Sequence, residues 1–214
     1  MSSMAARLMH NRLFSEVYEK AWRPLFTRGF SLGGSSTADF DRALRAYLAR
    51  PGERRVLDVA CGPGNYAEDA ARGLTGDGRY VGLDYSQAML VRAAHDHPGD
   101  RITFIRGDGH QLPFSSRSFD TVTCLAALYL IPDPLEVLDE MVRVTRPGGE
   151  VVVFTSVQAS IASLPGARAV AGLSGLRIFG AQEITACLTA LGMTHVEQSI
   201  TGVGQYVIAR KPRQ

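Results

Sequence analysis

The sequence has few of the features that mark secreted, membrane-spanning or metal-binding proteins. Its three cysteines, Cys61, Cys124 and Cys187, are odd in number and far apart, so they match neither a disulfide framework nor a metal-ligand spacing. No stretch approaches the roughly 18 apolar residues of a membrane span. Arg7 and Arg12 interrupt the apolar residues near the start, which leaves no core for a secretion signal. We therefore expect reduced thiols, a cytoplasmic location, no integral membrane segment and no metal site.

An excess of one charge is also missing. The chain has 23 Lys and Arg residues against 21 Asp and Glu residues, for a formal net charge of +2, and the basic residues are scattered. A nucleic-acid partner is therefore not expected. The composition, 45% hydrophobic and 21% charged over 214 residues, is that of an ordinary globular protein. Length and the even spread of apolar residues predict a single domain over 1–214 and leave the oligomeric state open.

Short β-branched runs alternate with helical stretches along most of the chain. The predicted strands are Arg55–Val59, Tyr80–Leu83, Ile102–Ile105, Thr121–Cys124, Glu150–Thr155, Thr194–Ile200 and Gln205–Ala209. The predicted helices between them are Asn65–Leu74, Ser86–Ala94, Pro134–Val144 and Ala181–Leu191. Strand–helix–strand units join by right-handed crossovers into a parallel sheet with helices on both faces. The pattern predicts an α/β, Rossmann-like, doubly wound seven-stranded sheet, mostly parallel, with an antiparallel hairpin at its C-terminal edge.

Two segments stand outside this alternation. A helix over 5–20 and another over 37–49 predict an N-terminal helical cap over 1–50. The stretch 156–180 carries only two charged residues and breaks the strand–helix rhythm. We interpret it as a substrate lid whose apolar side chains suit a hydrophobic acceptor; a buried connecting helix is the alternative.

A glycine turn follows the first strand of the sheet. In the run V-L-D-V-A-C-G-P-G-N, Gly62 and Gly64 lack the Cβ that would keep a ligand away from the backbone. Asp58 can accept hydrogen bonds near this loop. Asp84, at the end of the second strand, can accept from both hydroxyls of a ribose. Together they describe a nucleoside pocket, although a tight turn and, for Asp84, a helix cap are the alternatives.

The same loop also fits a dinucleotide. Gly62, Gly64 and Ala67 satisfy the G-x-G-x-x-G/A fingerprint, and Asp84 follows at about the expected distance. In nicotinamide enzymes such a loop holds the pyrophosphate at a helix N-terminus. On these residues alone, a nicotinamide-dependent oxidoreductase therefore stays open.

Further segments resemble one enzyme family. The run R-G-D-G-H-Q-L-P-F at Arg106–Phe114 and the S-F-D at Ser118–Asp120 precede the predicted fourth strand, and T-R-P-G-G at Thr145–Gly149 precedes the fifth. With the glycine loop and its acids they resemble class I S-adenosylmethionine-dependent methyltransferases. The closest branch is that of ubiquinone and menaquinone biosynthesis methyltransferases. The resemblance covers roughly Arg54–Thr155 and weakens the nicotinamide interpretation, because such an enzyme has no need for Asp108 in this context.

The resemblance implies site residues by position. Around the methionine part of S-adenosylmethionine it places Asp58, Ala60, Cys61, Gly62, Gly64, Cys124 and Leu125. Around the ribose and the adenine it places Asp84, Tyr85, Met89, Asp108, Gly109 and His110. Asp84 would hold the ribose hydroxyls, and Asp108 would accept a hydrogen bond from the adenine amino group. The turn at Thr145–Gly149 is expected to be architectural.

The catalytic residues are less well defined, because a histidine of the family is replaced. A-L-Y-L-I-P stands where many relatives read A-L-H-H-V-P, so Tyr129 occupies that position. A phenol with a pKa near 10 is a poor base at neutral pH, and we expect Tyr129 to orient the substrate or to pack in the core. His110 is the other catalytic candidate. Tyr18 and Trp22 could contact the sulfonium or pack on the core, and Arg23 could bind an acidic acceptor or pair on the surface.

The resulting prediction is a methyltransferase that acts on an oxygen, carbon or nitrogen atom of a small, hydrophobic metabolite and releases S-adenosylhomocysteine. Its main task is to align acceptor, methyl carbon and sulfur while excluding water. The replaced histidine keeps a second hypothesis open, a catalytically silent S-adenosylmethionine-binding regulator or scaffold. The small-molecule acceptor is the partner we expect; its identity, the methylated atom and the general base are left open.

Overall fold

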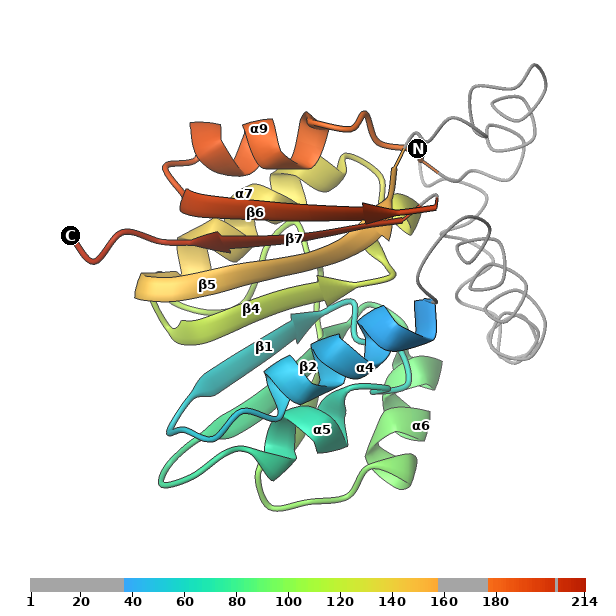
Figure 1. Ribbon diagram of the computed structural model, residues 1–214. Helices are drawn as coiled ribbons and strands as arrows, with labels where there is room; N and C mark the ends of the chain where they lie inside the picture. The colour runs from blue at the N-terminus through green and yellow to red at the C-terminus, as the bar shows by residue number, and fades with distance from the viewer. Residues whose placement is uncertain (1–36, 158–176, 203) are drawn as a thin grey trace.

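The computed structural model describes residues 37–157, 177–202 and 204–214. They form a seven-stranded sheet with the order β3-β2-β1-β4-β5-β7-β6 (Figure 1). The strands are β1 (Arg55–Val59), β2 (Arg79–Asp84), β3 (Ile102–Arg106), β4 (Phe119–Leu125), β5 (Thr145–Ser156), β6 (Thr194–Thr201) and β7 (Gly204–Arg210). The helical elements are α4 (Thr37–Leu48), α5 (Ala67–Arg72), α6 (Gln87–Asp96), η2 (Leu128–Leu130), α7 (Pro134–Val144) and α9 (Glu183–Ala190). The predicted doubly wound α/β fold is confirmed.

Parallel pairing builds the part of the sheet around β1. β1 pairs in parallel with β2 and β4, β2 with β3, and β4 with β5. The carboxyl ends of these strands therefore meet along one side of the sheet, which we call the carboxyl edge. The strand order reverses between β1 and β4. In open α/β sheets, ligands bind outside the carboxyl ends of the strands at such a reversal.

Helices cover both faces of the sheet, as predicted (Figure 1). On one face, α4 and α5 share an apolar cluster with the strands that includes Leu44, Leu48, Val56, Ala67, Ala70, Tyr80 and Val152. On the other face, α7 and α9 share a cluster that includes Leu57, Val59, Val122, Leu138, Met141, Ile184 and Leu188. Successive side chains of a strand point to opposite faces, so Val56 and Leu57 join different clusters. Asp58 consequently lies on the face that α4 and α5 cover.

The C-terminal strands form the antiparallel hairpin that the sequence predicts. β7 pairs antiparallel with both β5 and β6. β7 therefore lies inside the sheet and β6 forms its edge, where most β6 side chains are exposed.

The R-P-G-G segment differs from the simple turn that the sequence suggests. β5 already begins one residue before this segment, loses its pairing with β4, and pairs regularly again from Glu150 onward. Residues 146–149 thus bulge out of the ladder. The Lys211 carbonyl accepts from the Gly148 amide at 2.9 Å, and the Lys211 amide donates to the Gly149 carbonyl at 2.8 Å. Residues that follow β7 hold the bulge, so no local pattern could reveal it.

Helix bounds agree with the prediction at α7 and differ at α5. α7 spans Pro134–Val144, as predicted. α5 begins at Ala67 instead of Asn65, because the residues before it form consecutive turns. Beyond the end of α5, Leu74 forms a bridge with Gly52 and so leaves the predicted helix.

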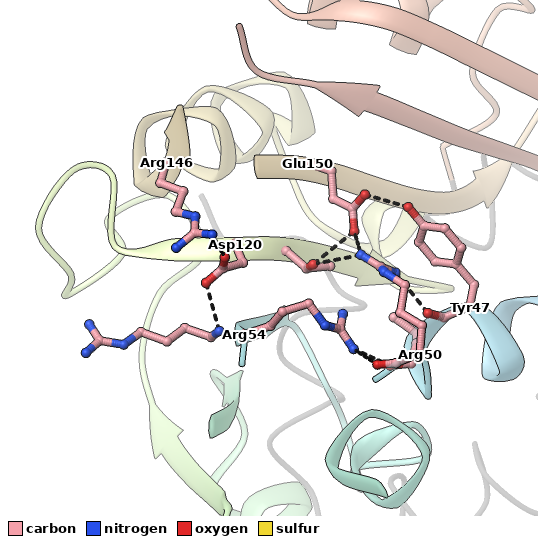
Figure 2. Close-up of polar contacts among 9 residues, drawn as sticks. Tyr47, Arg50, Arg54, Asp120, Arg146 and Glu150 are labelled. Atoms are coloured by element: carbon pink, nitrogen blue, oxygen red, sulfur yellow. Dashed lines mark hydrogen bonds and ion pairs between the residues drawn. The ribbon is translucent and has the colours of Figure 1, made fainter. Parts of the chain in front are cut away.

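A polar cluster fastens α4 to the amino edge of the sheet, opposite the carboxyl edge. The Glu150 carboxylate accepts a hydrogen bond from the Tyr47 hydroxyl at 2.5 Å and pairs with Arg50 (Figure 2). It also accepts from the Thr121 hydroxyl at 2.9 Å. Burial, together with the hydrogen bond to Glu150, raises the pKa of Tyr47 to about 12. These contacts join α4 to β4 and β5.

Some predicted features lie outside the described residues. They are the helix over 5–20, with Tyr18, Trp22 and Arg23 at or just beyond it, and the 158–176 part of the predicted lid. None of the helices that the structure describes combines the length and the apolar character needed to cross a membrane.

Candidate cofactor and active site

The loop that follows β1 has an unusual backbone. Ala60, Gly62 and Gly64 have φ angles of 56°, 55° and 80°, in the left-handed region that favours glycine. A Cβ added to Gly64 would lie 2.9 Å from the ring of Phe104, so this position requires glycine. A Cβ added to Gly62 would meet no described atom within 4 Å. The backbone at Gly62 therefore faces open space that a ligand can enter.

Asp84 joins this loop to the end of β2. Its Oδ2 accepts from the Gly62 amide and its Oδ1 from the Ser86 amide, both at 2.8 Å. The residue is 9% exposed. Burial raises the pKa of Asp84 above its ordinary value, and the hydrogen bonds from Ser86, Gly62 and Tyr85 oppose this effect. Each oxygen of an ionised carboxylate has room for a second hydrogen bond, so Asp84 can still accept from a ligand.

Asp58, near the end of β1, is buried. It accepts hydrogen bonds from the hydroxyl of Tyr80, on β2, and from the hydroxyl of Thr123, on β4, both at 2.8 Å. Burial raises the pKa of Asp58 to about 6, and the hydrogen bonds from Thr123 and Tyr80 only partly offset it. The carboxylate therefore ties β1, the strand that leads into the glycine loop, to its neighbours β2 and β4.

Asp108 and His110 follow β3. The Asp108 carboxylate is half exposed, and its Oδ1 accepts from the His110 amide at 2.9 Å. The His110 ring contacts the same oxygen through Nδ1 at 2.7 Å. Partial burial works against ionisation, but the bonds from His110 hold the pKa of Asp108 below its ordinary value. Asp108 therefore stays ionised at neutral pH.

The chain leaves β4 through a second strained turn. Cys124 and Leu125 are buried at the strand end, and Ala126 has a φ angle of 57°. Burial, with the nearby charges of Asp58 and Asp84, raises the pKa of both the Cys61 and the Cys124 thiols. Both thiols stay protonated, so neither is available as a nucleophile.

A cavity of about 170 Å³ lies beyond this turn, lined by Tyr129–Pro134 and Arg177. Tyr129 is 4% exposed, and its carbonyl accepts from the Arg177 amide at 2.9 Å. The Arg177 guanidinium pairs with Glu183 and lies 5.2 Å above the ring of Phe179. The lining thus combines apolar residues with one cation, Arg177, and one acid, Asp133.

The sequence-predicted cofactor residues come together at the carboxyl edge. Asp84 connects the loops after β1 and β2, and its carbonyl accepts from the Gly107 amide after β3 at 3.1 Å. Met89 is 5% exposed on α6, whereas Tyr85 is 56% exposed. Asp58 is 2% exposed. The roles of these residues stay predictions.

Sequence reasoning missed several residues of this region. Tyr80 and Thr123 hold Asp58, while Pro132 and Arg177 line the cavity. A buried acid is expected to have partners, but only strand register shows which residues supply them. Within the described ranges, no three His, Cys, Asp or Glu side chains gather as a metal site would need.

Comparisons with known proteins point to one family. Residues 57–153 match a family described as a methyltransferase domain. The chain is similar to the demethylmenaquinone methyltransferase of Lysinibacillus sphaericus, with 40% identity over 119 residues, 55% of this chain and 50% of that protein. It spans about half the length of the curated relatives it matches.

Solved structures share the fold. A S-adenosylmethionine-dependent methyltransferase from Mesorhizobium loti aligns with a TM-score of 0.65 at 22% identity, over 79% of this chain and 96% of that chain. Haemonchus contortus phosphoethanolamine N-methyltransferase 2, in complex with phosphomonomethylethanolamine and S-adenosylhomocysteine, aligns with a TM-score of 0.72 at 16% identity, over 95% of this chain and 60% of that chain. At these identities the likeness concerns the fold alone.

Proposed function

We propose that this protein is a class I S-adenosylmethionine-dependent methyltransferase of the ubiquinone and menaquinone biosynthesis type, and that it methylates an oxygen, carbon or nitrogen atom of a small, hydrophobic acceptor. The match of residues 57–153 to a methyltransferase domain and the similarity to the L. sphaericus relative support this proposal. The matching domain favours S-adenosylmethionine over a nicotinamide cofactor at the glycine loop. One observation carries the proposal: the buried Asp84 carboxylate is held between two backbone amides, beside the open backbone of Gly62.

The residues at the carboxyl edge fit an adenosyl ligand. Asp84 is held in place by Gly62 and Ser86 and keeps lone pairs for two ribose hydroxyls. Asp108 uses one oxygen for His110, and no residue in the described part of the chain bonds the other. That oxygen is suited to the adenine amino group.

When bound, S-adenosylmethionine supplies a methyl group that its sulfonium already activates. The chain has to add alignment and exclusion of water. We assign alignment of the methionine part to residues 60–64 and to the Cys124–Leu125 strand end. In this proposal Asp58 holds the strands beside the glycine loop together and does not contact the cofactor, because its carboxylate already bonds Tyr80 and Thr123.

We assign the acceptor to the cavity lined by Tyr129–Pro134 and Arg177. Tyr129 would orient the acceptor, and the Arg177 cation would attract an oxygen of a ring hydroxyl or carbonyl. The name of the L. sphaericus relative, demethylmenaquinone methyltransferase, fits a hydrophobic ring acceptor. The single-domain organisation, with a helical cap over 1–50 and a lid over 156–180, and the cytoplasmic location belong to the same proposal.

Cofactor binding tests the first part. We expect Asp84→Asn to weaken S-adenosylhomocysteine binding about 10-fold to 150-fold in isothermal titration calorimetry, since hydrogen bonds to a charged group contribute about 1.5–3 kcal/mol. Asp96→Asn is the matched control, because Asp96 lies on α6 and bonds His95 and Arg92 instead. Equal dissociation constants for the two variants would refute the assignment of Asp84.

Turnover tests the second part. The protein is incubated with radiolabelled S-adenosylmethionine and a metabolite extract, and label should pass to an apolar small molecule. Arg177→Gln should raise the KM for that molecule while the affinity for S-adenosylhomocysteine stays unchanged. Tight cofactor binding without any labelled product would instead favour the silent regulator, which the replacement of the family histidine by Tyr129 allows.

A further inference from the structure

The ring of His110 connects two loops of the carboxyl edge. Its Nδ1 lies 2.7 Å from Oδ1 of Asp108, and its Nε2 lies 2.7 Å from the carbonyl oxygen of Pro132. Asp108 belongs to the loop after β3, on the proposed adenine side. Pro132 precedes α7 and lines the cavity that we assign to the acceptor. One side chain therefore spans both halves of the proposed site.

The two contacts together require a particular protonation state. A carbonyl oxygen can only accept, and an ionised carboxylate can only accept. A neutral imidazole has one N–H group, so it can donate to Pro132 or to Asp108 but not to both. The other contact, at 2.7 Å, would then face two lone pairs toward each other. Only the imidazolium form, with two N–H groups, satisfies both partners.

The surrounding charges favour that form. Asp108 faces the ring from the β3 loop, and Glu136 faces it from α7. Asp133 is the other acid at the start of α7, and Arg106, the last residue of β3, is the basic residue closest to His110 in the sequence. Partial burial lowers the pKa of His110, but the bonds to Asp108 and Pro132 and the two acids outweigh it and raise the pKa above 6.5.

We propose that His110 is a positioning residue that acts as a protonated latch: it holds the Asp108 loop against the Pro132 loop, and cofactor affinity falls when the ring loses its proton. The inference rests on the proposed function, because it concerns the same cofactor. With the latch closed, the Asp108 carboxylate is held where it can accept a hydrogen bond from the adenine amino group. With the ring neutral, one contact opens and the two loops separate.

The first measurement follows the proton directly. In NMR titrations of the ligand-free protein, the His110 ring signals should titrate with a midpoint above about 6.5, and both ring nitrogens should carry protons below that midpoint. His110→Gln identifies the signals. A titration midpoint at or below about 6.5 would overturn the latch.

The second measurement follows binding against pH. Wild-type affinity for S-adenosylhomocysteine should fall about threefold to tenfold as the pH rises through the measured His110 midpoint. Adenosine serves as a second probe, since it has no group that titrates in this range. His110→Gln should bind with little pH dependence, whereas His95→Gln, at an exposed histidine on α6, should keep the wild-type profile.

The outcomes separate the latch from the proposed function. Binding that is independent of pH, or a His110→Gln profile identical to that of the wild type, would overturn the latch and leave the methyltransferase proposal standing. Absence of S-adenosylhomocysteine binding at every pH would overturn the proposed function, and the latch with it.

Discussion

The buried charge of Asp58 should make the stability of this protein depend on pH in a defined window. Burial raises the pKa of Asp58 from 3.8 to about 6. The folded state therefore holds the Asp58 proton more tightly than the unfolded state does. This proton binding stabilises the fold fully below about pH 3.8, and the stabilisation is lost as the pH rises through about 6. The difference between the two pKa values corresponds to about 3 kcal/mol in total.

Asp58→Asn removes the titration and should keep the fold. Asparagine has nearly the same shape and retains one acceptor oxygen for Tyr80. Thr123 has a second acceptor in the Leu57 carbonyl, at 3.3 Å. The lost hydrogen bond costs about 1–3 kcal/mol at any pH, whereas the penalty for the buried charge applies only to the wild type.

The difference in the free energy of unfolding between Asp58→Asn and the wild type should therefore change with pH. Between pH 5 and pH 7.5 the free energy of unfolding of the wild type should fall by about 1.4 kcal/mol relative to that of the variant. Urea unfolding followed by circular dichroism at the two pH values measures this change. Asp100→Asn, at an exposed position between α6 and β3, should show no such effect. A constant difference for Asp58→Asn, within about 0.3 kcal/mol, would refute the reasoning.

Three other substitutions, one of them with a control variant, test the rest of the scaffold by urea unfolding. Glu150→Gln leaves Arg50 without its carboxylate partner and should lower the free energy of unfolding by about 1–3 kcal/mol, whereas Asp39→Asn, in an exposed ion pair, should change it by under about 0.5 kcal/mol. Met141→Ala, at a fully buried position of α7, should cost about 2–5 kcal/mol. Ala60→Gly relieves a left-handed alanine and should gain up to about 1 kcal/mol; a loss would contradict the assignment of strain.

Local patterns carried the fold prediction. The helix over Pro134–Val144 was predicted with its correct bounds, because its apolar residues recur at helical spacing and Pro134 marks its first turn. β1 was also predicted with its correct bounds. The helix pattern depends on residues within one or two turns, and the strand pattern depends on alternation along a single strand. Both patterns are local, so they can be seen directly in the sequence.

Features that depend on distant residues were not predictable in this way. The bulge at residues 146–149 is held by the backbone of Lys211, and the start of α5 is delayed by turns that shape the glycine loop. Propensity near Asn65 permits a helix, but the tertiary path of the loop decides otherwise.

For the site, the sequence by itself determined the chemical groups: glycines after β1, and carboxylates within β1, at the end of β2 and after β3. The tertiary structure alone decided what each carboxylate does. Asp58 is bonded by residues 22 and 65 positions away, and the His110 ring reaches a carbonyl 22 positions away. Such contacts follow from the register of parallel strands and the packing of their loops, which bring together groups that no local pattern connects.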